Sequence, residues 1–226
     1  MNLTLQTIPS TVISEILAQS SLDGVVLDTE HGCFNNETLY SCIQVITLLN
    51  KKCFVRVTDF NKQLIRMSLD ANVDGIIFST FEEEFGGHEL ISYCNYPTKG
   101  KRGCGLVREN KWGKEPLCQK KPILIAQIET AQAVENIKYI SKIPFDYFLI
   151  GPYDLSSSLG IAGQFEDKKF KYYKSLIYDA IPLEKLGLFL PTFENMKSID
   201  YTTRPKLIIW GMDTNFLTDG ISRIKL

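Results

Sequence analysis

The feature of this sequence that most restricts its fold is a repeated alternation of short apolar runs with amphipathic segments. Several runs, such as GVVLD and GIIF, are apolar or nearly so throughout, which is typical of strands buried on both faces of a parallel sheet. Eight runs fit this description, at residues 3–8, 24–28, 53–57, 75–78, 123–128, 147–150, 188–190 and 207–210. The segments with helical spacing are 11–19, 38–49, 61–71, 130–142, 168–180 and 193–199. Because the alternation continues without a break in composition, it predicts one domain spanning residues 1–226, an α/β fold whose eight parallel strands close into a (β/α)8 TIM barrel.

Composition excludes several other classes of protein. The 25 Lys and Arg residues are balanced by 26 Asp and Glu residues, so the net charge is −1 and binding to nucleic acid is not expected. No apolar run approaches the roughly 20 residues that span a bilayer, and the segment MNLTLQTIPS lacks the features of a signal peptide. We therefore expect no membrane association and a cytoplasmic location. The six cysteines form no C-x-x-C pair and are expected to be reduced thiols: Cys33, Cys42, Cys53, Cys94, Cys104 and Cys118.

Two polar segments interrupt the alternation. Residues 95–121 form a long connection that holds Trp112, which we interpret as a side chain that pins the loop to the barrel. The same connection contains a basic run that would either attract an anionic substrate or be solvated, the commoner outcome: Lys99, Lys101 and Arg102. Residues 151–167 follow a strand directly and are rich in Gly and Ser, which suits a loop whose backbone approaches a ligand.

Charged and polar side chains follow four of the predicted strands at the point where each strand ends. They are Asp28, Glu30 and His31 after the second strand, Arg56 on the third, Gln127 and Glu129 on the fifth, and Asp154 after the sixth. In a barrel of parallel strands all the carboxyl ends meet on one face, and that face carries the active site. The sequence therefore predicts that these four segments contribute to one site.

Glu129 and Asp154 are the candidate metal ligands. Two carboxylates without a neighbouring Lys are costly to bury together, and a divalent cation relieves their repulsion. Few protein ligands, all of them oxygen, suit Mg²⁺ or Mn²⁺, with water or substrate completing the coordination shell. An alternative of similar weight is that Glu129 caps the helix beginning at Thr130 and that Asp154 caps a turn at Ser156.

His31 and Arg56 are the candidate groups for proton transfer and for charge stabilisation. His31 directly follows a buried strand, and Asp28 or Glu30 would orient its imidazole ring. The alternative is a His satisfied by backbone at a turn before Gly32. Arg56 ends an apolar strand, where its guanidinium would hold a carboxylate or an oxyanion, a role compatible with an ion pair to Asp28 or Glu30.

Six segments of the chain, taken in order, carry a family resemblance: LDTEHGCFNNETL, FVRV, KRGCGLVRENKWG, AQIETAQAVENI, FLIGPYDLSSSLGIAGQ and IIWGMDTNFL. They resemble the class II pyruvate aldolases of the HpcH/HpaI family, which includes aldolases of 2-keto-3-deoxy sugar acids. The match covers nearly the whole chain, and D-x-E-H-G, Q-I-E-T and G-P-x-D-L-S together are specific. The resemblance implies a (β/α)8 barrel of the phosphoenolpyruvate/pyruvate superfamily and reversible aldol cleavage of a 4-hydroxy-2-oxo acid to pyruvate and an aldehyde.

The resemblance also implies a role for each matching residue. Glu129 and Asp154 would bind a divalent metal, Mg²⁺, Mn²⁺ or Co²⁺, and Arg56 would bind the keto oxygen of pyruvate. His31, paired with Asp28, would move the proton of the substrate hydroxyl. Gln127 would lie beside the metal, and the backbone around three further residues would hold the pyruvate carboxylate: Gly151, Pro152 and Tyr153.

The chain departs from the family pattern in places. Relatives usually continue for a further helix that is exchanged between subunits, whereas this sequence has room only for a shortened C-terminal helix. The segments FVRVTDF and IIFSTF lack the prolines that relatives have there. We expect a homo-oligomer, based on dimers and possibly a hexamer. The alternative functions are a related C–C lyase with an acyl-CoA substrate and a non-catalytic subunit that binds a metal or a 2-keto acid.

Overall fold

The computed structural model describes residues 1–58, 60–116, 121–191 and 204–224, and within these ranges eight parallel strands close into a barrel. The strands are β1 (Asn2–Gln6), β2 (Gly24–Asp28), β3 (Lys52–Val57), β4 (Gly75–Phe78), β5 (Ile123–Ile128), β6 (Tyr147–Ile150), β7 (Leu186–Leu190) and β8 (Leu207–Met212). Each strand pairs with the next along the chain, and β1 pairs with β8. The predicted closed barrel is confirmed, with strand ends within two residues of those expected.

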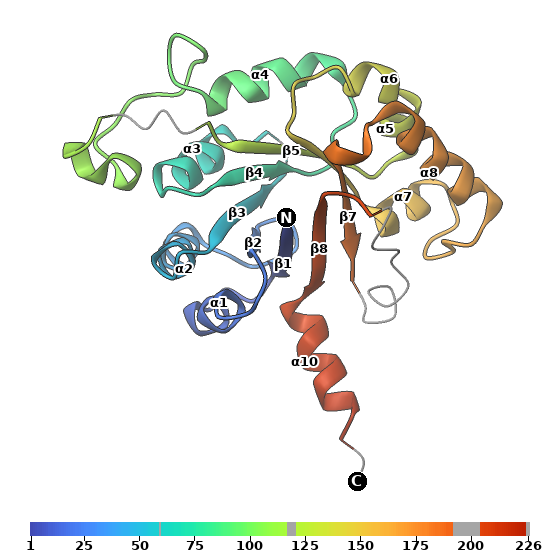
Figure 1. Cartoon of the computed structure of the whole chain (residues 1–226), viewed down its shortest axis with the longest axis horizontal. Helices are drawn as coiled ribbons and strands as arrows, with labels where there is room; N and C mark the ends of the chain where they lie inside the picture. Colours follow the sequence, from blue (N-terminus) through green and yellow to red (C-terminus); the bar gives the residue numbers. More distant parts are fainter. Residues whose placement is uncertain (59, 117–120, 192–203, 225–226) are drawn as a thin grey trace.

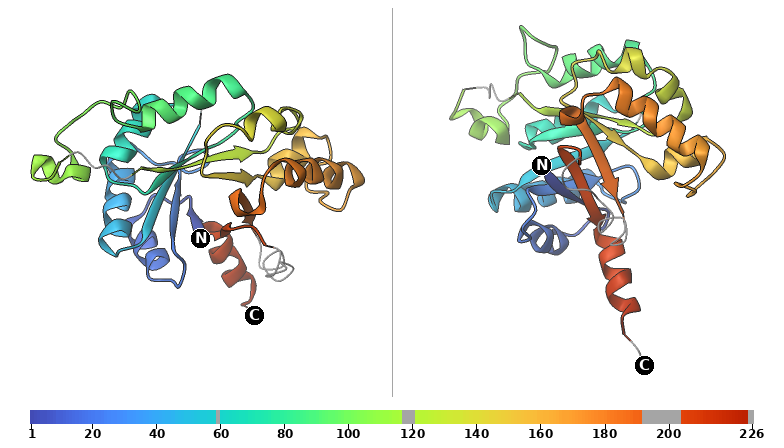
Figure 2. Two further views of the ribbon diagram at one scale, coloured as in Figure 1. Left: turned by 45° about the horizontal axis from the view of Figure 1, so that its top comes forward. Right: turned by 45° about the vertical axis from the view of Figure 1, so that its right-hand side comes forward.

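Helices surround the strands (Figure 1). Their bounds are α1 (Thr11–Ala18), α2 (Asn36–Leu48), α3 (Lys62–Asp70), α4 (Glu84–Cys94), α5 (Ala131–Glu135), α6 (Ile137–Ile140), α7 (Pro152–Ser158), α8 (Lys168–Ala180) and α10 (Asp213–Ser222), with 3-10 turns η1 (Arg108–Gly113) and η2 (Leu183–Lys185). In the described ranges, no helix has the length and apolar character needed to cross a bilayer. Figures 1 and 2 show α10 projecting away from the barrel, and its side chains Leu217 and Ile221 are largely exposed.

The helices differ from the sequence pattern in three places. The expected helix at 130–142 is divided at Asn136, whose side-chain amide donates to the carbonyl of Glu82. Helix α4 lies where Gly86 and Gly87 weaken the helical pattern, and α7 lies within the segment expected to be a loop. The expected helix at 193–199 and Cys118 lie outside the described residues.

The apolar core has two layers, because successive strand residues point to opposite faces of the sheet. Val26, Phe54 and Ile125 fill the inside of the barrel, while neighbours such as Val25 and Val55 pack outward against the helices. Asp213 at the start of α10 links the end of β8 to the end of β1. Its carboxylate accepts hydrogen bonds from the backbone amides of Thr7 and Ile8, which follow β1.

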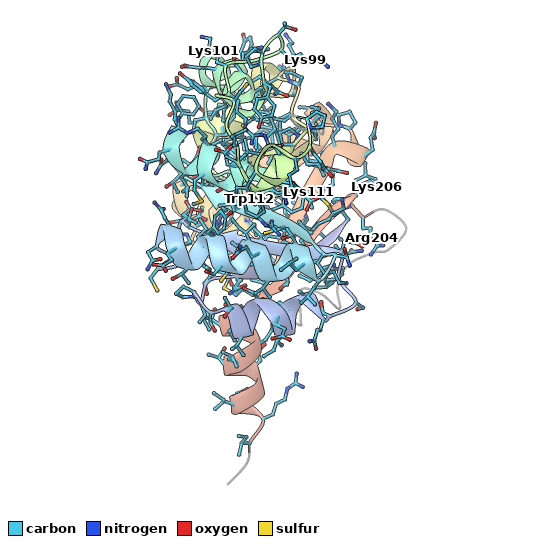
Figure 3. The ribbon with its side chains drawn as sticks, turned by 90° about the vertical axis from the view of Figure 1, so that its left-hand side faces the viewer. Lys99, Lys101, Lys111, Trp112, Arg204 and Lys206 are labelled. Carbon is cyan, nitrogen blue, oxygen red and sulfur yellow. The ribbon has the colours of Figure 1, made fainter. Side chains whose placement is uncertain are left out.

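The long connection before β5 is held by buried polar groups and not by Trp112. Arg102 is 3% exposed and donates to Asp70 at 2.8 Å and to Glu109 at 2.6 Å, and it stacks on the ring of Tyr96. The expectation that Arg102 is solvated is therefore wrong. Trp112 is 62% exposed, so its assignment as the anchor is also wrong. Figure 3 shows Trp112 near Lys111, whereas the exposed residues Lys99 and Lys101 of the same connection lie farther away, at the top of the view.

Candidate active site

The ends of β2 and β3 are joined by a buried ion pair. The strand register places Asp28 directly opposite Arg56. Arg56 Nε donates to Asp28 Oδ1 at 2.8 Å and Arg56 Nη2 donates to Asp28 Oδ2 at 2.7 Å, while Nη1 lies 3.1 Å from Glu30 Oε2. Asp28 is fully buried and Arg56 is 8% exposed. Burial lowers the pKa of Arg56, but the hydrogen bonds and charge of Asp28, with the charges of Glu30 and Glu129, raise it above the ordinary value.

This ion pair corrects the role expected for Asp28. Both oxygens of Asp28 accept hydrogen bonds from Arg56, and Oδ1 also accepts one from the backbone amide of Glu30, so Asp28 does not pair with His31. The imidazole instead lies beside Glu30, with 4.0 Å between His31 Nε2 and Glu30 Oε2. The side chain of His31 is 66% exposed, which leaves it accessible to a substrate. Of the two carboxylates considered for orienting His31, the structure favours Glu30.

Glu129 is a buried carboxylate at the end of β5, with only 2% of its surface exposed. Its Oε1 accepts hydrogen bonds from the backbone amide of Thr80 at 2.6 Å and from Thr80 Oγ1 at 2.8 Å. Its Oε2 accepts a hydrogen bond from Gln127 Nε2. Burial and the negative charges of Glu30 and Asp154 raise the pKa of Glu129, although the hydrogen bonds of Thr80 lower it. The carboxylate is therefore held in place in surroundings that disfavour its charge.

Gly151 lies directly against this carboxylate at the end of β6. A Cβ atom on Gly151 would lie 2.8 Å from both Cβ and Oε2 of Glu129 and 3.0 Å from Gln127 Nε2. Any larger residue would displace Glu129 or Gln127, so the close approach requires glycine. Gly151 precedes Pro152 at the start of α7, and Asp154 lies in the first turn of that helix. Asp154 and Tyr153 are exposed.

The structure decides whether Glu129 caps the helix that follows it, as the alternative to a metal ligand required. Thr130, not Glu129, caps α5, because its side chain accepts a hydrogen bond from the amide of Ala133. The carboxylate of Glu129 points instead to Thr80. At the turn that Asp154 was considered to cap, Ser156 Oγ donates to the carbonyl of Tyr153 and accepts from the amide of Gly163. The hydrogen bonds of Glu129 are therefore those of a side chain fixed within a site.

Sequence reasoning missed Thr80, which follows β4 with a positive φ of 50°. The signal was available, because Ser79 and Thr80 are polar residues directly after the apolar strand Gly75–Phe78. The same criterion identified Asp28, Arg56 and Glu129. Thr80 contacts Glu129 through both its amide and its hydroxyl.

The residues around Glu129 are suited to a divalent cation. The charges of Asp28, Glu30 and Glu129 raise the pKa of Arg56, and those of Glu30 and Asp154 raise the pKa of Glu129, so four carboxylates act on this part of the barrel. In addition, the buried side-chain oxygen of Gln127, beside Glu129, has no hydrogen-bond partner among the described residues. Within those same ranges, no three Asp, Glu, His or Cys side chains converge closely enough to hold a metal by themselves. A site built here would therefore rely on two protein carboxylates and further ligands from water or substrate.

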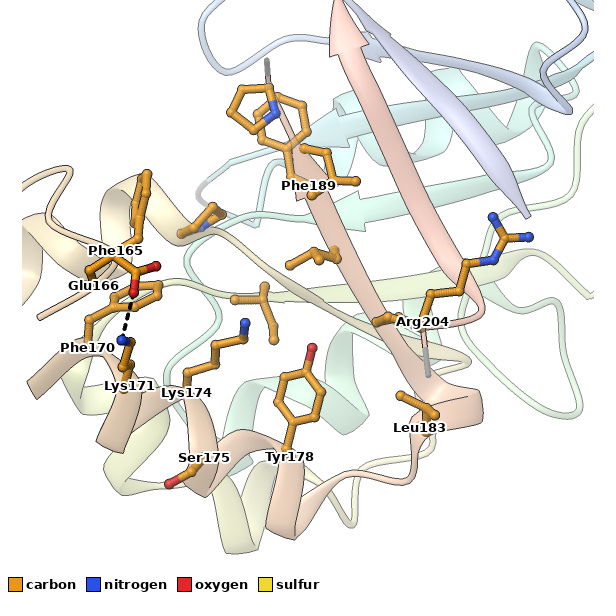
Figure 4. Close-up of a pocket in the computed structure, with 16 residues that line it drawn as sticks. Phe165, Glu166, Phe170, Lys171, Lys174, Ser175, Tyr178, Leu183, Phe189 and Arg204 are labelled. Carbon is orange, nitrogen blue, oxygen red and sulfur yellow. Dashed lines mark ion pairs between the residues drawn. The ribbon is translucent and has the colours of Figure 1, made fainter. Parts of the chain in front are cut away.

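A separate cavity of about 780 Å³ lies between α8 and β7 (Figure 4). Aromatic side chains, including Phe165, Phe170 and Phe189, form much of its wall, and Lys174 and Tyr178 reach into it from α8. Of the residues predicted to form the site, only Pro152 lines this cavity. The polar strand ends described above are therefore distinct from it.

Comparison with known proteins agrees with this architecture. The chain is 29% identical over 224 residues to the 2-keto-3-deoxy-L-rhamnonate aldolases of Salmonella gallinarum and Salmonella typhi, an alignment that covers 92% of this chain and 78% of the relatives. It is similar in structure to an HpcH/HpaI aldolase/citrate lyase family protein from Burkholderia cenocepacia, with a TM-score of 0.88 at 20% identity and coverage of 99% and 92% of the two chains.

The citrate synthase SbnG has a TM-score of 0.84 to this chain at 24% identity, with coverage of 98% and 89%. These structural similarities support the barrel fold. The model of one protein family, HpcH/HpaI aldolase/citrate lyase, matches residues 9–201. Because that match spans most of the sequence, the chain belongs to the HpcH/HpaI aldolase/citrate lyase family of enzymes.

Proposed function

We propose that this enzyme is a divalent-metal-dependent aldolase that cleaves a 4-hydroxy-2-oxo acid reversibly to pyruvate and an aldehyde. The observation that carries the proposal is the buried carboxylate of Glu129, fixed by Thr80 and Gln127 against Gly151 and facing the negative charge of Asp154. Membership of an aldolase/lyase family and the relatives that act as 2-keto-3-deoxy-L-rhamnonate aldolases support it.

Glu129 and Asp154 are the residues proposed to hold Mg²⁺, Mn²⁺ or Co²⁺. Such an ion, when bound, supplies Lewis acidity toward the oxygens of a 2-keto acid. Gln127 lies beside Glu129 and helps to keep its carboxylate in place. The backbone around Gly151, Pro152 and Tyr153 begins α7 and is proposed to hold the substrate carboxylate. The amide of Gly151 donates to the carbonyl of Ile128 and Pro152 has no N–H, so the donor from this segment would be the amide of Tyr153 in the first turn of the helix.

Arg56 stabilises the negative charge that develops on the keto oxygen when the C3–C4 bond breaks. Its position is suited to this role, because the hydrogen bonds to Asp28 fix the plane of the guanidinium and use two of its five N–H donors; Nη1 lies beside Glu30, and the second N–H of Nη2 is not used by Asp28. Asp28 acts here as the residue that positions Arg56.

His31 removes the proton from the C4 hydroxyl during cleavage and returns it during synthesis. Glu30 orients the imidazole, with 4.0 Å between its carboxylate oxygen Oε2 and His31 Nε2. The exposure of His31 allows a substrate to reach it.

The test is exchange of the methyl protons of pyruvate with deuterium in D₂O, which needs no knowledge of the aldehyde. Exchange should require Mg²⁺, Mn²⁺ or Co²⁺ and stop on addition of EDTA. Glu129→Ala and Asp154→Ala should remove Mn²⁺ binding and exchange, while the control Glu184→Ala, at an exposed turn before β7, should not. His31→Ala should retain Mn²⁺ binding and slow cleavage by roughly 10²–10⁴-fold. Metal binding unchanged in both carboxylate variants would contradict the proposal.

A related lyase that acts on an acyl-CoA is the second candidate, because the family description includes citrate lyase. Pyruvate exchange without cleavage of any 4-hydroxy-2-oxo acid would favour it. We also propose a homo-oligomer based on dimers, supported by the exposed apolar residues Leu217, Ile221 and Ile224 at the C-terminal helix. Light scattering would measure its mass, and a monomer would contradict this assembly.

A further inference from the structure

Two hydrogen-bond donors of Thr80 converge on one oxygen atom of Glu129. The backbone N–H and the hydroxyl of Thr80 lie 2.6 Å and 2.8 Å from Glu129 Oε1. A carboxylate oxygen has about two lone-pair directions, so the two donors of Thr80 occupy both lone pairs of Oε1. Oε2 accepts one hydrogen bond, from Gln127, and retains one free direction.

The backbone on both sides of Thr80 is tied to neighbouring strands. The amide of Ser79 donates to the carbonyl of Val57 on β3, and the amide of Phe81 donates to the carbonyl of Gln127 on β5. Between these anchors Thr80 has a φ of 50°, a left-handed conformation that costs a β-branched residue roughly 1–3 kcal/mol. The conformation directs both the amide and the hydroxyl of Thr80 toward Glu129.

The other oxygen of Glu129 faces the end of β6. A Cβ atom on Gly151 would lie 2.8 Å from Oε2, which places this oxygen against the residue that precedes α7. Asp154, the second carboxylate of the site, lies in the first turn of that helix. Oε2 is therefore the oxygen that lies against the segment that carries Asp154.

We propose that Thr80 is a positioning residue that holds the Glu129 carboxylate in a single orientation, with Oε1 committed to Thr80 and Oε2 left as the one oxygen that coordinates a divalent cation. This inference rests on the proposed metal-dependent function. Glu129 would then bind the cation through one oxygen only. The residue that selects this oxygen, Thr80, is not itself one of the two proposed metal ligands.

The experiment compares Mn²⁺ binding by isothermal titration calorimetry in the wild type, Thr80→Val and Thr80→Ser. Valine keeps the shape and the amide but removes the hydroxyl, so the dissociation constant should rise by roughly 10–100-fold, as for other residues that orient a metal ligand. Serine restores the hydroxyl and should return the affinity close to that of the wild type. Infrared difference spectra should show a monodentate carboxylate band of Glu129 that changes in Thr80→Val and returns in Thr80→Ser. Glu129→Gln identifies this band by removing it.

Thr80→Gly provides a second variant without the hydroxyl, in which the positive φ is no longer unfavourable. Ser79→Ala is the matched control, because the hydroxyl of Ser79 donates to Val57 and not to Glu129, and it should leave the affinity unchanged. If both Thr80→Val and Thr80→Gly bind Mn²⁺ with wild-type affinity while Glu129→Ala does not bind it, the proposed role of Thr80 is wrong and the proposed metal site stands. A wild-type protein that binds no Mn²⁺ would overturn the proposed function as well.

Discussion

Replacing Gly151 by Ala tests the geometry of the candidate site with a single methyl group. The added Cβ would lie 2.8 Å from Oε2 and Cβ of Glu129, about 0.6 Å short of the 3.4 Å at which ordinary contact begins. Gly151 has a φ of −94°, which every residue adopts, so the substitution adds no backbone strain. The effect of Gly151→Ala therefore reports the steric conflict with Glu129.

Glu129 has little freedom to avoid this conflict, because Thr80 and Gln127 bind both of its oxygens. We expect overpacking to cost about 1–3 kcal/mol of stability, which corresponds to a fall in Tm of roughly 2–12 °C for a chain of this length. Displacement of Oε2 should weaken Mn²⁺ binding by about 10–100-fold. Calorimetry measures both quantities on the same variant, by thermal scan and by titration.

The matched control is Gly86→Ala in α4, where an added Cβ meets no atom within 4 Å. This variant should be as stable as the wild type or more stable by about 0.5–1 kcal/mol, because Ala favours a helix over Gly, and it should bind Mn²⁺ equally well. Folded Gly151→Ala protein with the Mn²⁺ affinity and Tm of the wild type would refute the placement of Glu129 against Gly151.

Two further predictions concern buried charges. Burial raises the pKa of Glu129, so the folded state holds this proton more tightly than the unfolded state and loses stability as pH rises from about 4.5 through the folded pKa. Glu129→Gln should therefore raise the Tm of the metal-free protein at pH 8 but not at pH 4, and an equal change at both values would contradict this reasoning. Arg102→Met leaves Asp70 and Glu109 without their cation and should cost about 3–5 kcal/mol in urea unfolding, whereas Lys111→Met, in an exposed pair, should have little effect.

Tertiary structure decided which partner each polar residue has. For Asp28 the sequence offered two partners, His31, three residues away, and Arg56 of the adjacent strand, and the barrel places Arg56 directly opposite it. Arg102 belongs to a basic run that suggests solvation, yet the fold buries it between two carboxylates from different segments. Such contacts depend on strand register and on how a long connection packs, and local sequence patterns do not contain this information.

Thr80 shows the same limit within the site. Its position after a strand was visible, but its contact with Glu129 depends on a left-handed backbone conformation and on the pairing of β4 with β5. Gly151 was expected to offer its backbone to a ligand, and only the assembled barrel revealed that its lack of a side chain makes room for Glu129.

The sequence by itself determined the number and order of the strands and the strand ends that carry Asp28, Arg56, Gln127 and Glu129, while closure of the barrel, which eight strands favour over an open sheet, was established by the pairing of β1 with β8. It did so because burial on both faces leaves a continuous apolar run, and a charged residue that ends such a run must face a polar site or a partner. Only the tertiary structure decided that Arg56 neutralises Asp28, that Glu30 lies beside His31 and that Thr80 orients Glu129. The contacts of Arg56 with Asp28 and of Thr80 with Glu129 join residues at the ends of different strands, so they depend on strand register and on the packing of the barrel.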